Sequence, residues 1–177
     1  MILEEDLKLS ALKQVAMDMV IAARTAPKGR GMDNLVVKIA ERRDIQSIAA
    51  KMKEMSETYS APGFIRDAEN ILQCQFMLLL GARVRSVGLK KCGMCGFANC
   101  DEKNQHPLIP CIFNSSDLGI AIGSAVSLAA DRRVDNRIMY TVGQAVLALN
   151  LFPPEVKIIL AIPLSATSKS PFFDRVP

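Results

Sequence analysis

The sequence predicts a mixed α and β fold in which helices cover a β-sheet and one small cysteine-rich insert interrupts the chain. Helical and strand patterns alternate along its whole length. The 177 residues are 50% hydrophobic, so they can bury a sizeable core without disulfides. Four of the five cysteines fall between Cys92 and Cys111. We therefore predict one domain over residues 1–177, with residues 90–112 as a metal-binding insert.

The first half of the chain predicts a helix, a strand and a second helix. Apolar residues recur at three-and-four spacing from Leu7 to Arg24, which is typical of an amphipathic helix that ends before Pro27. A short β-branched run at residues 35–40 predicts a strand. Asp44 is then a plausible N-cap for a helix that reaches residue 57.

Beyond residue 75 the predicted elements have clear sequence signals at their ends. Residues 76–81 form a short apolar run that stops at a glycine, which indicates a buried strand. Residues 115–117 (Ser-Ser-Asp) predict the cap of a helix that runs to Arg132. A further helix is expected to start at Asp135, and a strand at residues 156–162 is expected to end at Pro163.

Composition and charge exclude several functional classes. The formal net charge of +4 is modest, and the chain has no Trp and two Tyr, so a nucleic-acid partner is not expected. No apolar run reaches about 18 residues, so no membrane span is expected. The chain begins with Met-Ile-Leu-Glu-Glu-Asp, which is acidic where a signal peptide is basic. We therefore expect a cytoplasmic protein whose cysteines serve as metal ligands or catalytic groups.

The four clustered cysteines carry the strongest chemical signal. Cys92, Cys95, Cys100 and Cys111 follow the spacing C-x2-C-x4-C-x10-C, and glycines at 93 and 96 let the backbone fold around a metal centre. Four thiolates can hold a [4Fe–4S] cluster or a zinc ion, and the third alternative is four thiols that bind no metal. The stretched second half fits zinc less well, because structural zinc usually pairs two short knuckles. The fifth cysteine, Cys74, is expected to be a buried structural thiol.

A basic, glycine-containing loop follows the first predicted helix. Its candidate ligand-binding residues are Arg24, Thr25, Lys28, Arg30 and Gly31. Arginine and lysine bind phosphate, and glycine allows close backbone approach. The order of a P-loop is absent, so the residues alone leave open either a phosphate site or a solvated basic loop.

The cysteine segment C-G-x-C-G-x-x-x-C resembles the iron–sulfur motif of corrinoid iron–sulfur proteins and of an electron-transport complex subunit. The resemblance covers about twenty residues and implies a low-potential [4Fe–4S] cluster. The remaining chain resembles the nitroreductase family of flavoenzymes. The pattern that carries this likeness is an apolar helix ending in Ala-Ala-x-x-Ala-Pro, a loop, a Val-rich strand and a small-residue helix from Asp117 to Ala130.

The combination of both parts also looks like a prokaryotic family described as ferredoxin-domain proteins. It shares the Ala-Arg-Thr-Ala-Pro stretch, the cysteine insert and an Asp-Arg pair at positions 174–175. The nitroreductase likeness implies a helix-covered sheet and FMN bound at the interface of a homodimer. A redox partner protein is a separate expectation for an electron-transfer protein. Aligned on Pro27, this chain has Lys28, Gly31 and Asp33 where the family's flavin motif has Ser, Asn and Gln.

Two functions therefore emerge from the sequence. The first is a redox protein that transfers electrons through an iron–sulfur cluster or acts as a flavin-linked oxidoreductase. The second is a non-enzymatic domain that a zinc ion staples together and that binds or assembles other proteins. Metal content separates the two.

Overall fold

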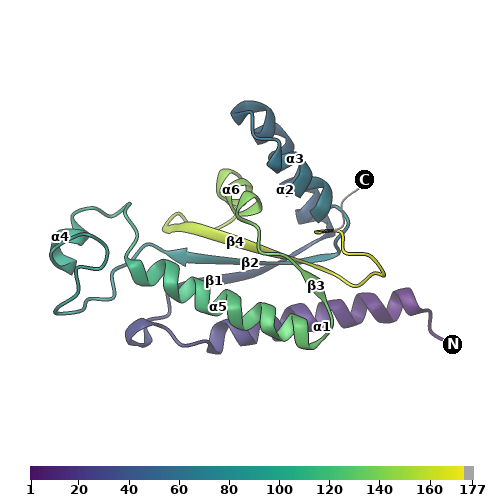
Figure 1. The fold of residues 1–177 in the computed structure, drawn as a ribbon, viewed down its shortest axis with the longest axis horizontal. Helices are drawn as coiled ribbons and strands as arrows, with labels where there is room; N and C mark the ends of the chain where they lie inside the picture. The colour runs from purple at the N-terminus through teal and green to yellow at the C-terminus, as the bar shows by residue number, and fades with distance from the viewer. Residues whose placement is uncertain (174–177) are drawn as a thin grey trace.

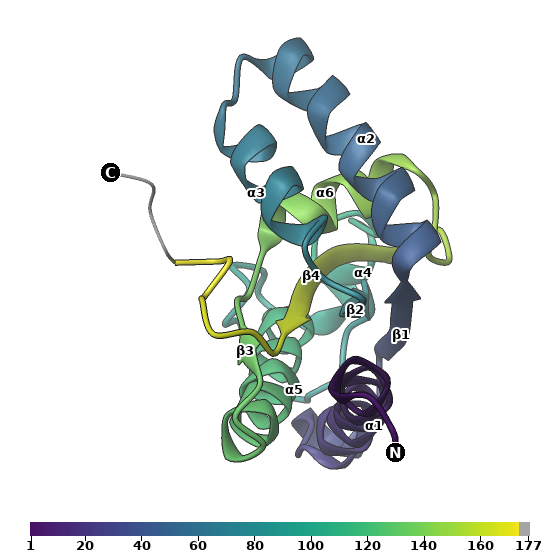
Figure 2. The same ribbon diagram turned by 90° about the vertical axis from the view of Figure 1, so that its right-hand side faces the viewer.

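In the computed structural model, which describes residues 1–173, helices cover both faces of one open antiparallel sheet, as the sequence predicts (Figures 1 and 2). The strand order is β1-β2-β4-β3. The strands are β1 (Leu35–Glu41), β2 (Phe76–Arg83), β3 (Asp135–Asn136) and β4 (Val156–Ser165). The helices are α1 (Glu4–Thr25), η1 (Gly29–Gly31), α2 (Arg42–Tyr59), α3 (Gly63–Ile71), α4 (Cys100–Asn104), α5 (Ile112–Asp131) and α6 (Tyr140–Ala148).

The sheet separates two hydrophobic cores. On one face α1 and α5 lie side by side, and on the other face lie α2, α3 and α6 (Figure 2). The central strand β2 contributes alternate side chains to both cores, with Leu78 and Leu80 facing α1 and α5, and Met77 and Leu79 facing the other helices. A strand buried on both faces reads as a continuous apolar run, which explains why residues 76–81 are recognisable in the sequence.

The helix α1 confirms the amphipathic prediction and runs a few residues further at each end. Its buried side chains recur at helical spacing and pack against α5 and the sheet. Among residues 1–173, α5 is the one helix whose length and apolar composition would allow it to cross a membrane. Its inner side chains belong to the core shared with α1, as in the core helix of a globular protein.

Two predicted helix starts are wrong by a few residues. The N-cap of α2 is Glu41, and Asp44 is the third helical residue, whose Oδ2 accepts a hydrogen bond from the Glu41 N–H at 3.1 Å. In α5 the N-cap is Cys111, and Asn114 Oδ1 accepts from the Cys111 N–H at 2.9 Å. In both cases the third helical residue bonds back to the N-cap of its own helix, and only in α2 is that residue, Asp44, the one predicted as the cap. Residues 115–117 therefore lie inside α5.

The helix predicted from Asp135 also starts too early. Asp135 and Asn136 form the short strand β3 instead, paired with Ser165 and Leu164 of β4. The helix α6 begins only at Tyr140, after Met139 has bridged Ala161. Pairing with a strand some thirty residues away overrides the local helical periodicity.

The strand β4 continues through Pro163 to Ser165, so the predicted end at Pro163 is wrong. Proline fits because Ala161 exchanges both backbone hydrogen bonds with Met139, which places the nitrogen of residue 163 on the same edge of the strand. On that edge the pairing is interrupted between Asn136 and Met139. The missing N–H of Pro163 therefore costs no ladder hydrogen bond. Asp174 and Arg175 lie outside the described residues.

Candidate functional site

The cysteine-rich insert forms a small lobe beyond the ends of β2 and α5, at the left of Figure 1. We call residues 90–111 the cysteine lobe. Its one regular element is α4, which Asn99 caps by accepting a hydrogen bond from the Glu102 N–H at 2.9 Å. The rings of Phe97 and His106 stack with centroids 5.0 Å apart, so His106 packs within the lobe.

The C-x2-C segment of the lobe is a tight turn. Gly93 and Gly96 have φ angles of +87° and +90°, and the Gly96 N–H donates to the Gly93 carbonyl at 3.0 Å. Only glycine adopts such angles without strain, which explains why glycine follows Cys92 and Cys95. Both glycines therefore fold the backbone sharply here, and the folding of this turn around a metal centre stays a prediction.

All four predicted ligands are free thiols. Cys92, Cys95 and Cys100 are half-buried, and Cys111 is buried at the start of α5. Cys100 Sγ donates to the Leu89 carbonyl at 3.8 Å. Among residues 1–173, no three Cys, His, Asp or Glu side chains lie close enough to hold one metal ion as they stand. The ligand set stays a prediction, whose donor chemistry, four sulfurs on one lobe, fits a thiolate centre.

The first arginine of the basic loop binds within its own loop. Arg24 forms an ion pair with Asp33 at 2.5 Å and donates to the Leu35 carbonyl at 3.3 Å. Burial raises the pKa of Asp33, but hydrogen bonds from Arg24 and the Leu35 N–H, with the charges of Arg24 and Lys28, outweigh burial and hold that pKa below its ordinary value.

Two other predicted loop residues stabilise the end of α1. Lys28 Nζ donates to the carbonyls of Ala23, Arg24 and Ala26 at 3.3, 2.6 and 2.6 Å. A cation at this point satisfies the last carbonyls of the helix and complements its dipole. Thr25 Oγ1 donates back to the Ile21 carbonyl at 3.0 Å. All three protons of Lys28 are therefore occupied by the helix end.

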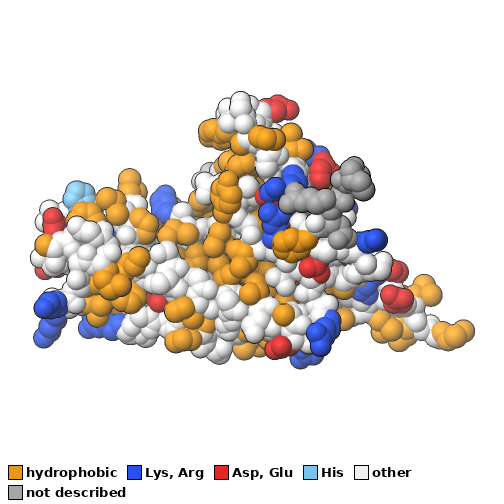
Figure 3. Space-filling model, viewed as in Figure 1, with side chains coloured by type: hydrophobic (Ala, Val, Ile, Leu, Met, Phe, Trp, Pro, Cys, Tyr) orange, Lys and Arg blue, Asp and Glu red, His pale blue; other side chains and the backbone are white. Residues whose placement is uncertain are grey.

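Arg30 connects the basic loop to the chain that enters the cysteine lobe. Its guanidinium donates to the carbonyls of Val87 and Gly88 at 3.0 and 2.7 Å. Arg30 and Gly31 have φ angles of +56° and +68°, so the backbone turns sharply here. The loop thus contacts the segment that leads into the lobe, 57 and 58 residues further along the chain. Figure 3 shows Lys and Arg side chains at this end of the molecule, on the left, and also at the opposite end.

The start of α5 holds the same loop from its other side. The Gly29 N–H donates to the buried Asp117 carboxylate at 3.0 Å. A Cβ on Gly29 would lie 2.5 Å from the Phe113 ring, so only glycine allows this approach. The sequence does not predict that Asp117 binds the Gly29 N–H, because an Asp beyond the first turn of a helix has no local pattern that marks it as buried.

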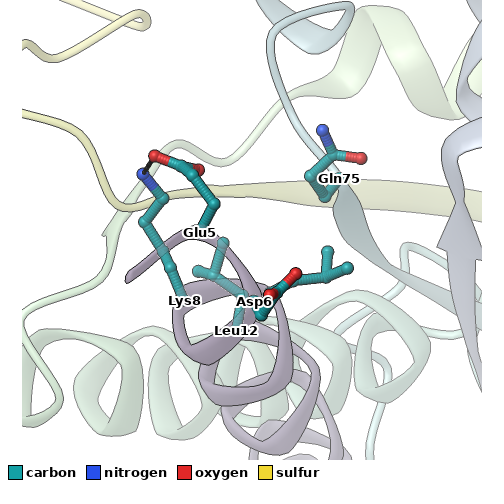
Figure 4. Close-up of a pocket in the computed structure, with 6 residues that line it drawn as sticks. Glu5, Asp6, Lys8, Leu12 and Gln75 are labelled. Atoms are coloured by element: carbon teal, nitrogen blue, oxygen red, sulfur yellow. Dashed lines mark hydrogen bonds and ion pairs between the residues drawn. The ribbon is translucent and has the colours of Figure 1, made fainter. Parts of the chain in front are cut away.

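Asn34, which follows the basic loop, has an unsatisfied amide. Its side chain is buried, and Nδ2 has no hydrogen-bond partner among the described residues. Such an orphaned donor favours a bound acceptor at this end of β1. Three surface hollows among residues 1–173, of about 200, 250 and 360 Å³, lie elsewhere. The one in Figure 4 lies between the start of α1 and Gln75, where Glu5 pairs with Lys8 at 2.9 Å.

A protein of Archaeoglobus fulgidus, named "Uncharacterized protein", is 42% identical to this chain over 98% of the chain and 97% of its own length. The model of a family described as "Uncharacterized protein containing a ferredoxin domain (DUF2148)" matches residues 109–175. The chain belongs to this family. The matched segment of this DUF2148 protein includes Cys111 and begins after the other three clustered cysteines.

Solved nitroreductases share the fold of this DUF2148 protein. The nitroreductase CinD from Lactococcus lactis, in complex with chloramphenicol, superimposes with a TM-score of 0.64 over 89% of this chain and 79% of its own, at 11% identity. A nitroreductase with bound FMN from Desulfitobacterium hafniense gives a TM-score of 0.58 over 99% of this chain and 95% of its own, at 14% identity. The predicted nitroreductase-like fold is therefore confirmed.

Proposed function

We propose that this chain is a redox protein whose cysteine lobe holds a [4Fe–4S] cluster through Cys92, Cys95, Cys100 and Cys111. The observation that carries the proposal is the lobe itself, which places four free thiols and a glycine turn at one end of a nitroreductase-like body. The family's description as containing a ferredoxin domain supports it.

The chain's own residues would define the environment of such a cluster. The cluster, when bound, supplies one-electron transfer. The turn at Gly93 and Gly96 folds the backbone between Cys92 and Cys95, the two thiols closest in sequence. Cys111 precedes the first turn of α5, where the helix dipole favours negative charge. The half-buried Cys92 and Cys95 keep one side of the lobe accessible to a redox partner protein, which we propose as the electron source in the cytoplasm.

Anaerobic purification with iron and sulfide analysis tests this function. We expect about four iron and four sulfide per chain and a broad visible absorption that bleaches on reduction. Cys95→Ser should lose the absorption, whereas Cys74→Ser, in the core, should keep it. One zinc per chain without sulfide would instead support the zinc-stapled binding domain, and a metal-free protein would overturn both.

We further propose that FMN binds beside the lobe, at the loop of Arg24, Thr25, Lys28, Arg30 and Gly31. The FMN-containing oxidoreductases that share the fold support this, as does the orphaned Asn34 amide. Lys28 is occupied by the end of α1 and Arg24 by Asp33, whereas Arg30 bonds to other described residues through Nη1 alone, so Arg30 is the better phosphate ligand. A bound flavin would couple one-electron to two-electron transfer.

Heating the protein and measuring the fluorescence of the released flavin tests the FMN proposal. Arg30→Gln should lower the flavin content, because it removes a cation from the loop. Arg43→Gln, at an exposed position on α2, is the matched control. Wild-type protein without flavin after reconstitution with FMN would refute the proposal.

We also propose a homodimer formed through the outer face of α5. That face exposes Ile120 and two glycines, Gly119 and Gly123, whose Cβ positions meet no atom within 4 Å. Ile120→Lys should dissociate the dimer in light-scattering measurements. Ile65→Lys on α3 is the matched control, because Ile65 and Ile120 are each 46% exposed. A monomeric wild-type protein at high concentration would contradict this proposal.

A further inference from the structure

The cysteine lobe contains the most buried lysine or arginine among residues 1–173. Lys103 is 2% exposed, and its ammonium forms no hydrogen bond or ion pair with any described residue. The other buried charged side chains are compensated. Asp67 pairs with Arg66 at 2.8 Å, and Asp117 accepts from the Gly29 N–H. An unpaired buried ammonium costs several kcal/mol in general, so it requires a compensating negative charge.

Lys103 lies on the same side of α4 as Cys100. Residues three apart in a helix are neighbours on its surface, and Cys100 is half-buried. The acidic residues of the same turn, Asp101 and Glu102, are exposed, and the Glu102 carboxylate accepts from the Ala98 N–H at 2.7 Å. The inward face of α4 thus carries a thiol and a cation, and its carboxylates face solvent.

We propose that Lys103 is the counter-charge of the thiolate centre in the lobe. This inference rests on the proposed function. Four thiolates leave a net charge of about −2 on either a [4Fe–4S]²⁺ cluster or a Zn²⁺ ion, and one buried ammonium offsets part of it. Lys90 and Lys91, which directly precede Cys92 in the sequence, are exposed, so water and salt screen their charges.

The buried position makes Lys103 a residue that sets the reduction potential. When the cluster accepts one electron from an electrode, its charge changes from about −2 to about −3, and no bond forms or breaks. A nearby unscreened cation stabilises the reduced form more than the oxidised form. Removal of the Lys103 charge should therefore make reduction less favourable.

Voltammetry of the anaerobically purified holoprotein tests the proposal. Lys103→Met removes the charge at similar length, and Lys103→Arg keeps it. Lys91→Met is the matched exposed control. We expect Lys103→Met to disfavour reduction about tenfold, a midpoint potential lower by about 59 mV for one electron. The Lys103→Arg and Lys91→Met proteins should stay close to wild type.

The metal-free protein provides a second readout. If Lys103 is unpaired without metal, metal-free Lys103→Met should resist urea better than metal-free wild type, because the uncompensated charge is gone. A merely structural lysine predicts the opposite. Where the centre is zinc, Lys103→Met should release it to a chelator about tenfold faster, which corresponds to about 1.4 kcal/mol.

The outcomes separate this inference from the proposed function. A wild-type protein that binds neither iron nor zinc overturns both. A loaded wild type whose Lys103→Met variant keeps the same potential, or the same zinc release rate, overturns the role of Lys103 alone. If Lys103→Met fails to load metal, recovery of loading by Lys103→Arg supports the counter-charge. Failure of both variants while Lys91→Met loads normally overturns it.

Discussion

Replacement of Gly143 by alanine should strongly destabilise the fold, because α6 contacts the backbone of β4 at this residue. A Cβ at position 143 would lie 1.8 Å from the Ile159 carbonyl oxygen. An ordinary contact distance of about 3.4 Å requires the helix to move outward by about 1.6 Å. The flanking Val142 and Val146 are fully buried, and such a shift removes much of their packing.

The magnitude follows from those two valines. Full burial of a valine stabilises by about 1.5–3 kcal/mol, and a gap of this size forfeits about half of the contact energy. We expect a loss of about 1.5–3 kcal/mol, or roughly 3–12 °C in Tm for a chain of this length. Urea denaturation followed by circular dichroism measures it.

The matched control is Gly63→Ala at the start of α3, where a Cβ meets no atom within 4 Å. It should change stability by no more than about 0.5 kcal/mol. A loss below about 1 kcal/mol for Gly143→Ala would refute the close helix–strand contact.

Three further predictions test other parts of the chain. Thr141→Val removes the 2.7 Å hydrogen bond to the buried Asp67 carboxylate and should cost about 2 kcal/mol in urea denaturation, whereas Thr141→Ser should cost less. Burial, together with the charge of Asp135, raises the pKa of the Cys74 thiol to about 12. Iodoacetamide at pH 8 should therefore label the half-buried Cys92, Cys95 and Cys100 of metal-free protein before Cys74, as mass spectrometry would show, and equal labelling of Cys74 would contradict its burial. The pKa of Asp33 is lower in the folded protein than its ordinary value of 3.8. The ionised carboxylate therefore stabilises the folded state at pH values above 3.8, and this stabilisation is lost as the pH falls through the folded pKa. Asp33→Asn should therefore cost less than about 1 kcal/mol at pH 7, because the carboxylate is partly exposed, and the difference in urea midpoint should shrink below pH 3.8.

The local hydrophobic pattern is enough to find most of the fold. The three-and-four spacing of α1 and the apolar runs of β2 and β4 depend on neighbours in sequence, and each element lies where the pattern predicts. Helix starts are less predictable, since the side chain that signals the start can lie inside the helix, as Asp44 and the Ser-Ser-Asp segment at residues 115–117 do. The strand at Asp135 forms through its pairing with β4, and no local sequence pattern predicts that pairing.

In the candidate site too, features set by neighbours in sequence are predictable, and features set by distant contacts are not. Spacing alone identifies the four clustered cysteines and the core thiol Cys74, which is 1% exposed. The partners of the basic loop are non-local, so the contact of Arg30 with Val87 could not be foreseen. The burial of Lys103 also depends on the whole lobe, although its position three residues after Cys100 was visible in the sequence.

The proline in β4 has a consequence for solubility during folding and at high concentration. The edge of β4 opposite β2 is covered by only two residues of β3 and by the Met139 bridge. An N–H at position 163 would leave a free donor in the gap between them, where a strand from another molecule could pair. Pro163 has no such donor, so this gap in the pairing of β4, where residues 161–165 are buried, offers no free N–H to a strand of another molecule.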